Sequence, residues 1–223
     1  MVENKLIGLY GGAFDPVHKA HISIAKNCIK IIGLKKIIFI PTGNSPNNKI
    51  MSAHYHRLEM LNIVCTESSF EFSDFEINEY LKQKRISYTI NTLNFFKHRS
   101  DSTLLFILGT DAFSTINSWY KWNDILNYCH LVLIERSGKK SNIETMSREV
   151  QEYFKENKTN NINDLKKYNH GLIYPILMPI FDESSSEIRD RSMKNLDINN
   201  FLPEAIKDYI NKNGLYKLPG HNK

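Results

Sequence analysis

The chain has 223 residues, of which 41% are hydrophobic and 24% charged, so it is long enough to bury a sizeable core, and we expect one domain over residues 1–223. It shows no secretory or transit pattern, no apolar run near the roughly 18 residues of a membrane-spanning helix, and only three scattered cysteines, so we expect a soluble cytoplasmic protein with no membrane partner. A net charge of +5 suits phosphate-rich small molecules as well as nucleic acid, and the lack of a dense basic run with interleaved aromatic residues argues against nucleic acid as a partner.

Apolar, β-branched runs alternate with helical stretches along the chain. The first part has an apolar run at 5–10, a helical stretch at 21–32, an apolar run at 36–40, a helical stretch at 53–67 and a weaker apolar run at 70–72. The second part has helical stretches at 88–98, 111–128 and 143–156 and apolar runs at 103–108, 130–134 and 172–178. Most runs are continuous, which is typical of strands covered on both faces. The alternation predicts an α/β fold with a doubly wound parallel sheet.

Two parts of the chain depart from this alternation. Residues 138–170 are rich in lysine and asparagine and poor in large apolar residues, so we expect a polar excursion that contains a helix and is not a separate domain. Two further helices, one from Ser184 and one from Pro203, are expected to form a small C-terminal helical portion over residues 184–217. Proline is favoured in the first turn of a helix.

The segment GGAFDPVHKAH, residues 11–21, follows the first predicted strand. Its paired glycines allow the backbone to approach a ligand closely. His18 and His21 are three residues apart on the first turn of a helix, so they share one face. The same helix end presents unpaired N–H groups and a positive dipole end, and the combination predicts a phosphate site. Alternatively, one histidine caps the helix and the other lies on the surface.

Other phosphate or metal motifs fail on spacing. Gly8, Gly11 and Gly12 do not form GxGxxG, and Pro16 would break the following helix, which excludes a nicotinamide-dependent oxidoreductase. The stretch SGKKS at 137–141 lacks the upstream glycine of a Walker loop, where the chain has Leu133. His54 and His56 have no third ligand at useful spacing, so a polar helix start is expected there.

Two motifs at opposite ends of the chain resemble those of one superfamily. GGAFDPVHKAH is similar to the GG(S/T)FDPxHxGH signature of the nucleotidylyltransferases, with Ala13 and Ala20 as departures. SSSEIRDR, residues 184–191, resembles the SSTxIR motif of the same superfamily. A serine triplet by itself usually caps a helix. Here it also supplies hydroxyl and N–H groups, with Arg189 one turn on, that suit phosphate oxygens.

Further motifs narrow the resemblance to the bacterial-type nicotinate-mononucleotide adenylyltransferases, over nearly the whole chain except 138–170. They are HRLEML (56–61), RISYTINTL (85–93), FILGTDAF (106–113), SWYKWNDIL (118–126) and LPEAIKDYINKNGLYK (202–217). The resemblance implies a Rossmann-like fold and an enzyme of NAD biosynthesis. It would join ATP to nicotinic acid mononucleotide without a covalent enzyme intermediate, releasing pyrophosphate. The loop PTGNSPNNK (41–49) departs from the family pattern PxxxPPH(K/R), because asparagines stand near the place of the histidine.

The resemblance also implies roles for individual residues, with His18 and His21 as the catalytic pair. ATP would be bound by Gly11, Gly12, His18, His21, Gly109, Asp111, Ser184, Ser185 and Arg189. The mononucleotide would be bound by Ala13, Phe14, Ser87, Thr89, Trp119, Tyr120 and Arg136. Mg²⁺ would arrive on the nucleotide phosphates with no dedicated protein ligands. From the residues alone, Asp111 could equally be a helix N-cap, and Trp122 is expected in the core.

Two other functions stay open. A sibling enzyme acting on another phosphate, such as phosphopantetheine, would share both phosphate motifs but should lack SYT and WY. A catalytically silent binding relative should have lost a histidine or Arg189, and this chain retains all three. The sequence leaves open whether the chain forms a homo-oligomer, how strictly it selects the acid over the amide mononucleotide, and what residues 41–49 and 138–170 do.

Overall fold

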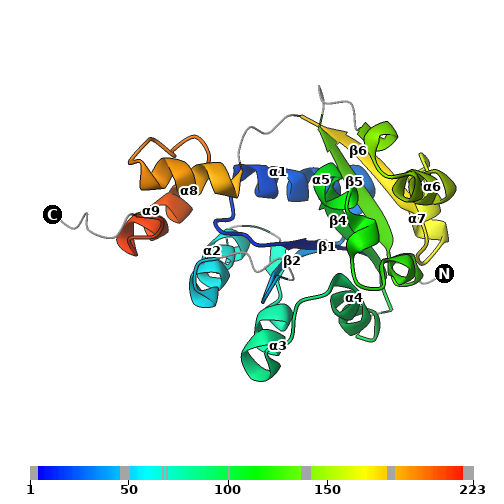
Figure 1. Cartoon of the computed structure of the whole chain (residues 1–223), viewed down its shortest axis with the longest axis horizontal. Coiled ribbons are helices and arrows are strands. Elements are labelled where there is room, and N and C mark those ends of the chain that lie inside the picture. Colours follow the sequence, from blue (N-terminus) through cyan, green and yellow to red (C-terminus); the bar gives the residue numbers. More distant parts are fainter. Residues whose placement is uncertain are drawn as a thin grey trace.

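The sheet of this protein is wholly parallel and doubly wound (Figure 1). The computed structural model describes residues 5–45, 51–66, 68, 70–99, 101–136, 142–179 and 184–217, without the side chains of Arg136 and Asn142. The strands are β1 (Leu6–Gly12), β2 (Lys36–Pro41), β3 (Phe70–Phe72), β4 (Thr103–Gly109), β5 (His130–Arg136) and β6 (Ile173–Met178). Their order is β3-β2-β1-β4-β5-β6. The connection reverses direction between β1 and β4, where open sheets of this type bind ligands. The predicted fold class is confirmed.

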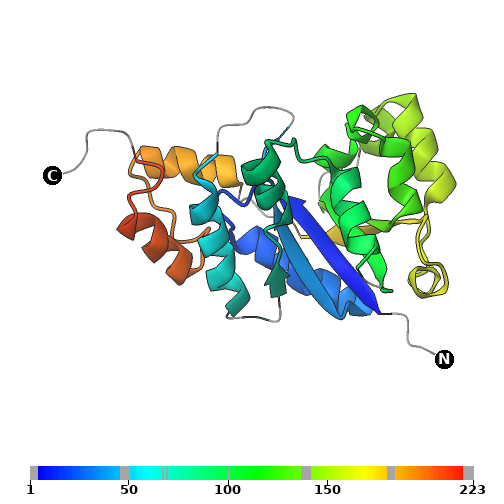
Figure 2. The same cartoon turned by 90° about the horizontal axis from the view of Figure 1, so that it is seen from below.

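Helices cover both faces of the sheet. They are α1 (Lys19–Cys28), α2 (His54–Thr66), α3 (Phe75–Gln83), α4 (Thr89–Lys97), α5 (Thr110–Phe113), α6 (Arg148–Asn157), α7 (Asp164–Lys167), α8 (Ser185–Met193) and α9 (Glu204–Lys212). A five-residue π-helical turn, Ile29–Gly33, continues α1. Figures 1 and 2 show α8 and α9 at one end of the molecule and α6 and α7 at the other. Within the described residues, no helix combines the length and the apolar character needed to cross a membrane.

The continuous apolar strands supply two separate cores. Tyr10 and Phe39 face one cluster, which includes buried residues of α1, α2, α8 and α9. Leu9 and Ile40 face the other cluster, which includes buried residues of α4 and α6. Successive side chains of a strand point to opposite faces of the sheet, so strands covered on both sides need apolar residues at every position. This requirement explains the unbroken apolar runs in the sequence.

Two expectations about helices are wrong. Helix α3 was not predicted from the sequence; of its residues only Ile77 is buried in the structure. The predicted continuous helix over 111–128 is instead the short α5 followed by 3-10 turns at Ile116–Ser118 and Trp122–Asn127. Trp119 is extended at ψ 144° and Lys121 has φ 53°, values that no α-helix accommodates. The break brings Trp119 out of a helix and into the site described below.

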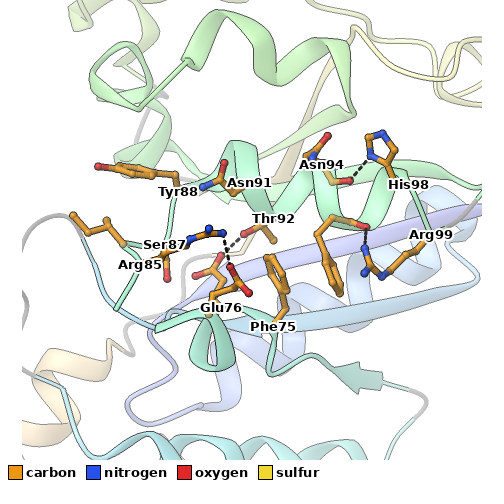
Figure 3. A pocket seen from close by; sticks show the side chains of 13 residues that line it. Phe75, Glu76, Arg85, Ser87, Tyr88, Asn91, Thr92, Asn94, His98 and Arg99 are labelled. Atoms are coloured by element: carbon orange, nitrogen blue, oxygen red, sulfur yellow. Dashed lines mark hydrogen bonds and ion pairs between the residues drawn. The ribbon is translucent and has the colours of Figure 1, made fainter. Parts of the chain in front are cut away.

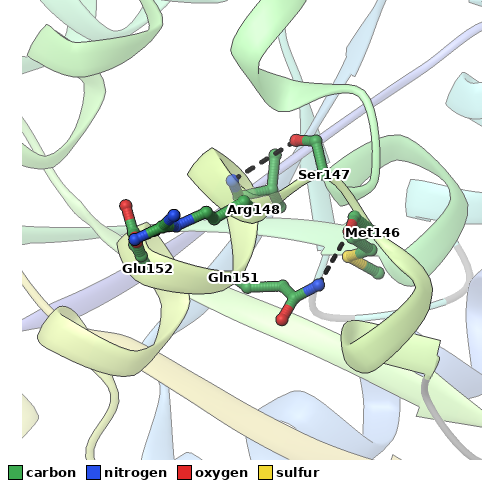
Figure 4. A network of polar contacts seen from close by, with 6 residues as sticks. Met146, Ser147, Arg148, Gln151 and Glu152 are labelled. Carbon is green, nitrogen blue, oxygen red and sulfur yellow. Dashed lines mark hydrogen bonds and ion pairs between the residues drawn. The ribbon is translucent and has the colours of Figure 1, made fainter.

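The polar segment folds around α6, which is fixed at its start by the contacts in Figure 4. Ser147 is the N-cap, and its hydroxyl accepts a hydrogen bond from the N–H of Val150 at 3.4 Å. Gln151 donates from Nε2 to the carbonyl of Met146 at 2.8 Å. The ion pair Arg148–Glu152, at 2.7 Å, lies on the exposed side of the helix. Val150 and Phe154 are buried, so the helix is attached to the second core cluster by its apolar face.

Candidate active site

A cleft of about 520 Å³ lies at the carboxyl ends of β1 and β4, where the winding of the sheet reverses. Three glycines from the ends of the two strands line it, so part of its wall is backbone that carries no side chain. The predicted site residues that line the cleft are Gly11, Gly12, His21, Ser87, Thr89, Gly109, Asp111, Trp119 and Tyr120. A concave site at this position of an open α/β sheet is the expected location of a ligand.

His18 and His21 lie ring against ring at the beginning of α1, with their planes tilted. His18 is the N-cap residue and is 4% exposed. The two ring centroids are 3.8 Å apart, with 36° between the planes. The backbone N–H of His18 donates to Nδ1 of His21 at 3.3 Å. Because Nδ1 of His21 accepts, a neutral His21 ring carries its proton on Nε2 and can donate it to a ligand.

The environment of His21 keeps its ring neutral in the free protein. Burial, and then the charge of neighbouring His18, hold the pKa of His21 well below its ordinary value. The ring packs edge-on against Phe14 at 5.0 Å between centroids and against Tyr10 at 5.9 Å. A bound phosphate would favour the charged form of the imidazole, so the pair can supply hydrogen bonds and charge where a phosphate arrives.

Helix α8 is docked on the loop that leads into α1. The hydroxyl of Ser185 donates to the carbonyl of Pro16 at 3.0 Å. The Arg189 guanidinium donates to the carbonyl of Asp15 at 2.7 Å. Ser184 is the N-cap of α8, and its hydroxyl accepts from the N–H of Glu187 at 3.1 Å. Two motifs from opposite ends of the sequence are therefore adjacent, with the beginnings of two helices at one place.

Buried polar groups beneath this loop hold it in shape. Arg57 on α2 is fully buried and donates to the carbonyls of Ala13, Thr42 and Ser52, at 2.9, 2.8 and 3.3 Å. Burial lowers the pKa of Arg57, and the charge of Asp15 is the largest of the opposing influences. These contacts fix the loops after β1 and β2 relative to each other. No role of Arg57 was predicted from the sequence, although Arg57 belongs to the HRLEML motif.

The Asp15 side chain accepts hydrogen bonds from two further parts of the chain. It is 1% exposed, and its carboxylate accepts from the N–H of Ser52 at 3.0 Å and from the hydroxyl of Tyr216 at 2.7 Å. Burial, then the charge of Asp15 and the hydrogen bond to it, raise the pKa of Tyr216. Both oxygens of this carboxylate are therefore engaged within the protein. The peptide bond between Asp15 and Pro16 is cis.

The far wall of the cleft carries Asp111 and aromatic side chains. Gly109 is the N-cap of α5, so Asp111 is not, and its exposed carboxylate lies in the first turn at the cleft. Trp119 packs edge-on against Phe106 at 6.4 Å between centroids. Tyr120 is 50% exposed. The helix-cap alternative for Asp111 is therefore wrong, and a carboxylate and an indole face the same cavity. Trp122 packs with the second core cluster, as expected.

Ser87 connects the loop after β2 to the beginning of α4. Its hydroxyl accepts from the N–H groups of Gly43 and Asn44 at 3.1 and 3.2 Å, and its own N–H donates to the carbonyl of Asn44 at 2.9 Å. Thr89 is the first residue of α4. The positive end of α4 thus lies at the cleft.

Several sequence-predicted site residues lie elsewhere or beyond the description. The Phe14 side chain is 1% exposed and in the core, so any contact with a mononucleotide falls to its backbone. The carbonyl of Ala13 is taken by Arg57. Arg136 ends β5, and its side chain is outside the described atoms. The described residues exclude part of the divergent loop, namely Asn47, Asn48 and Lys49. They also exclude the stretch SGKKS at 137–141.

The two histidines of α2 are engaged within the protein. His54 Nε2 hydrogen-bonds the carbonyl of Gly43 at 2.9 Å, and His56 Nδ1 hydrogen-bonds the Tyr209 hydroxyl at 2.9 Å. His54 therefore connects α2 to the turn after β2, and His56 connects α2 to α9. Among the described residues, no group of three or more His, Cys, Asp or Glu side chains is arranged to hold a metal ion.

Comparison with known proteins gives a consistent set of relatives. The family model described as cytidylyltransferase-like matches residues 9–191. A protein of Pectobacterium atrosepticum named probable nicotinate-nucleotide adenylyltransferase is 32% identical over 218 residues, which is 95% of this chain and 99% of the relative. A protein of the same name from Clostridium botulinum (strain Okra / Type B1) is 35% identical over 214 residues, 94% of this chain and 98% of the relative.

Solved structures match the same architecture. Plasmodium falciparum nicotinic acid mononucleotide adenylyltransferase complexed with NaAD aligns with a TM-score of 0.72 at 23% identity, covering 95% of this chain and 97% of that one. The same protein complexed with APC aligns with a TM-score of 0.70 at 22% identity over the same shares of the two chains. At this level of identity the likeness supports the fold.

Proposed function

The chain belongs to the cytidylyltransferase-like family and, within it, to the nicotinate-nucleotide adenylyltransferases, and on this basis we propose that its cleft joins ATP to nicotinic acid mononucleotide. The products would be nicotinic acid adenine dinucleotide, a precursor of NAD, and pyrophosphate. The family resemblance of the motifs is confirmed, as is the prediction of a nucleotidyltransferase.

One observation carries the residue-level part of this proposal. The histidine pair at the start of α1 and the serines and arginine of α8 are joined through the Asp15–Pro16 loop, although the two motifs are far apart in the sequence. Helix N-termini with cationic or hydrogen-bonding side chains are suited to phosphate groups. A triphosphate bridging the two helix ends would have its α-phosphorus close to the cleft, where the second substrate binds.

In the reaction, an oxygen of the mononucleotide phosphate attacks the α-phosphorus of ATP. A new P–O bond forms, the bond to the β-phosphate bridging oxygen breaks, and pyrophosphate leaves with the electron pair. No protein nucleophile is needed, so the chain contributes alignment and stabilisation of the charge that develops. His18 and His21 would stabilise the charge that develops on the phosphate groups, with Arg189, Ser184 and Ser185 on the side of the leaving pyrophosphate. Asp111 would accept hydrogen bonds from the adenosine ribose.

A divalent cation fits this arrangement as a companion of the nucleotide. Asp15, which lies within the phosphate loop, already accepts hydrogen bonds at both oxygens. Mg²⁺ prefers oxygen ligands and keeps several of its waters, so phosphate oxygens and water can supply most of its coordination. When bound, it would neutralise charge on the triphosphate. The chain's own part is to orient that triphosphate with His18, His21 and Arg189.

Product analysis tests the proposal directly. The full chain is incubated with ATP, Mg²⁺ and either nicotinic acid mononucleotide, its amide counterpart or phosphopantetheine, and the products are identified by mass spectrometry. We expect nicotinic acid adenine dinucleotide and an equal amount of pyrophosphate. Transfer to phosphopantetheine alone would assign the protein to the sibling reaction, and transfer to none of them would identify a silent binding protein.

Replacing Arg189 by Ala should raise the KM for ATP by about tenfold or more, because hydrogen bonds to charged groups contribute roughly 1.5–3 kcal/mol. Steady-state kinetics with each substrate varied in turn measure the effect. Arg191→Ala is the matched control, since Arg191 is on the same helix and donates to the carbonyl of Asp197 at 2.8 Å. An effect of Arg189→Ala on the mononucleotide KM alone would mean that the two subsites are assigned the wrong way round.

The acid mononucleotide should exceed the amide in kcat/KM by roughly tenfold or more, which is at least about 1.4 kcal/mol. N–H groups around Thr89 and Tyr120, at the positive end of α4 and on the cleft wall, would face the ring carboxylate, while Trp119 stacks on the ring. An amide would present its NH₂ to the same donors. The measurement compares both mononucleotides at saturating ATP, and equal efficiency would contradict the specificity while leaving adenylyl transfer intact.

A further inference from the structure

Glu76 lies between two segments that border the cleft. It is in the first turn of α3, and it lines the cleft together with Ser87 and Thr89. It also lines a second groove of about 390 Å³ between α3 and α4 (Figure 3). The sequence assigned no function to this residue, because α3 itself was not expected. Its position nevertheless places a carboxylate at the edge of the proposed mononucleotide subsite.

The Glu76 carboxylate is bonded to a helix other than its own. The hydroxyl of Thr92 on α4 donates to it at 2.6 Å, a contact that Figure 3 shows. Ser87 and Gly43 lie close enough to the carboxylate to lower its pKa. Ser87 in turn accepts from the N–H groups of Gly43 and Asn44. One side chain therefore connects α3, the start of α4 and the turn after β2.

Backbone packing reinforces this junction. A Cβ at Gly43 would overlap the carbonyl of Glu76, so the turn after β2 lies directly against α3. Burial raises the pKa of the Glu76 carboxyl, while the hydrogen bonds from Thr92, Ser87 and Gly43 and the charge of Arg57 oppose that rise. A half-buried carboxylate with a specific donor is costly to replace, because the donor would otherwise lose its partner.

We propose that Glu76 is a positioning residue for the mononucleotide subsite, which it shapes by fixing the Ser87–Thr89 segment against the Gly43–Asn44 turn. The inference rests on the proposed function, since it concerns one half of the same cleft. Glu76 acts through Thr92, to which it is bonded, and through the close packing of its backbone against Gly43, and its role is to set the separation of the two walls. The adenosine side of the cleft, at Gly109 and Asp111, belongs to β4 and α5 and is independent of this junction.

This arrangement predicts a selective kinetic effect of Glu76→Gln. A glutamine has one acceptor oxygen in place of two and no negative charge, so the hydrogen bond from Thr92 and the favourable interactions with Ser87 and Gly43 are weakened or lost. We expect the KM for the mononucleotide to rise about five- to tenfold, with the KM for ATP and kcat changed less than about threefold.

Two further variants make the test specific. Glu79→Gln is the matched control on the same helix, because Glu79 pairs with Arg85 at 3.1 Å and does not line the cleft; its kinetic constants should equal those of the wild type. Thr92→Val removes a donor to the same carboxylate from a residue that also does not line the cleft. It should raise the mononucleotide KM about two- to threefold, which tests the inference even if Glu76→Gln does not fold.

The outcomes separate the inference from the proposed function. Equal rises of KM for both substrates, or a lower melting temperature with unchanged kinetic constants, would show a purely structural role and overturn the inference alone. A wild-type protein that forms no dinucleotide would overturn the proposed function and the inference with it. A selective mononucleotide effect in both Glu76→Gln and Thr92→Val, absent from Glu79→Gln, supports the assignment.

Discussion

His21→Ala should lower kcat by roughly 10²–10³ or more while the protein stays folded, and His18→Ala should act similarly. Each ring would stabilise charge on the phosphate groups that are being exchanged. Because the pKa of His21 is well below its ordinary value, the ring of the free enzyme is neutral at pH 7–8 and still offers its Nε2–H. The loss therefore concerns a positioned donor, and it should appear in kcat more than in the KM for ATP.

The measurement is turnover at saturating substrates, with circular dichroism and the melting temperature as checks of folding. His98→Ala is a suitable control, because His98 is an exposed histidine whose Nδ1 hydrogen-bonds the carbonyl of Asn94 at 2.8 Å, away from the histidine pair. A folded His21→Ala protein with near-normal turnover would refute the catalytic assignment of the pair.

Arg57→Met should reduce the free energy of unfolding by about 3–5 kcal/mol, the range typical of breaking a buried charged network. The substitution keeps a long side chain but leaves the carbonyls of Ala13, Thr42 and Ser52 without their donor. It also removes a positive charge near buried Asp15. Activity should fall in the protein that remains folded, since the loops after β1 and β2 lose their common anchor.

Urea unfolding of the wild type and the variant measures this effect. Arg148→Met is the control, because Arg148 is 91% exposed and forms a surface ion pair, so its loss should leave the unfolding curve unchanged. Equal unfolding curves for Arg57→Met and the wild type would show that the three carbonyls find other partners and that Arg57 does not organise the site.

The strands could be predicted because the fold covers them on both faces. Each apolar run from residue 5 to residue 178 coincides with an observed strand to within about two residues at each end, as the burial of Ile37–Ile40 or Leu104–Leu108 requires. The two phosphate motifs could be found because their residues are contiguous and each begins a helix. Local sequence was therefore informative wherever the physical requirement is local.

The remaining parts depend on contacts between distant residues. Helix α3 is fixed by buried Ile77 and by the bond between Glu76 and Thr92, a residue of another helix. The break in the helix predicted over 111–128 depends on the left-handed conformation of Lys121. Neither a glycine nor a proline marks this position in the sequence. The role of Arg57 depends on carbonyl groups, which every residue has and no sequence pattern marks. Such features become visible only when the loops have been placed in space.

In the proposed site, the docking of α8 would couple nucleotide affinity to the stability of the C-terminal end of the chain. Ser185 and Arg189 adopt their positions only while α8 is seated on Pro16 and Asp15. A state in which α8 and α9 detach would keep the sheet but lose part of the proposed triphosphate site. By linkage, a nucleotide at 100 times its dissociation constant opposes such an opening by up to about 2.7 kcal/mol. The substrate would then also stabilise this end of the chain. Local unfolding of α8 and α9 would become rarer as the nucleotide concentration rises.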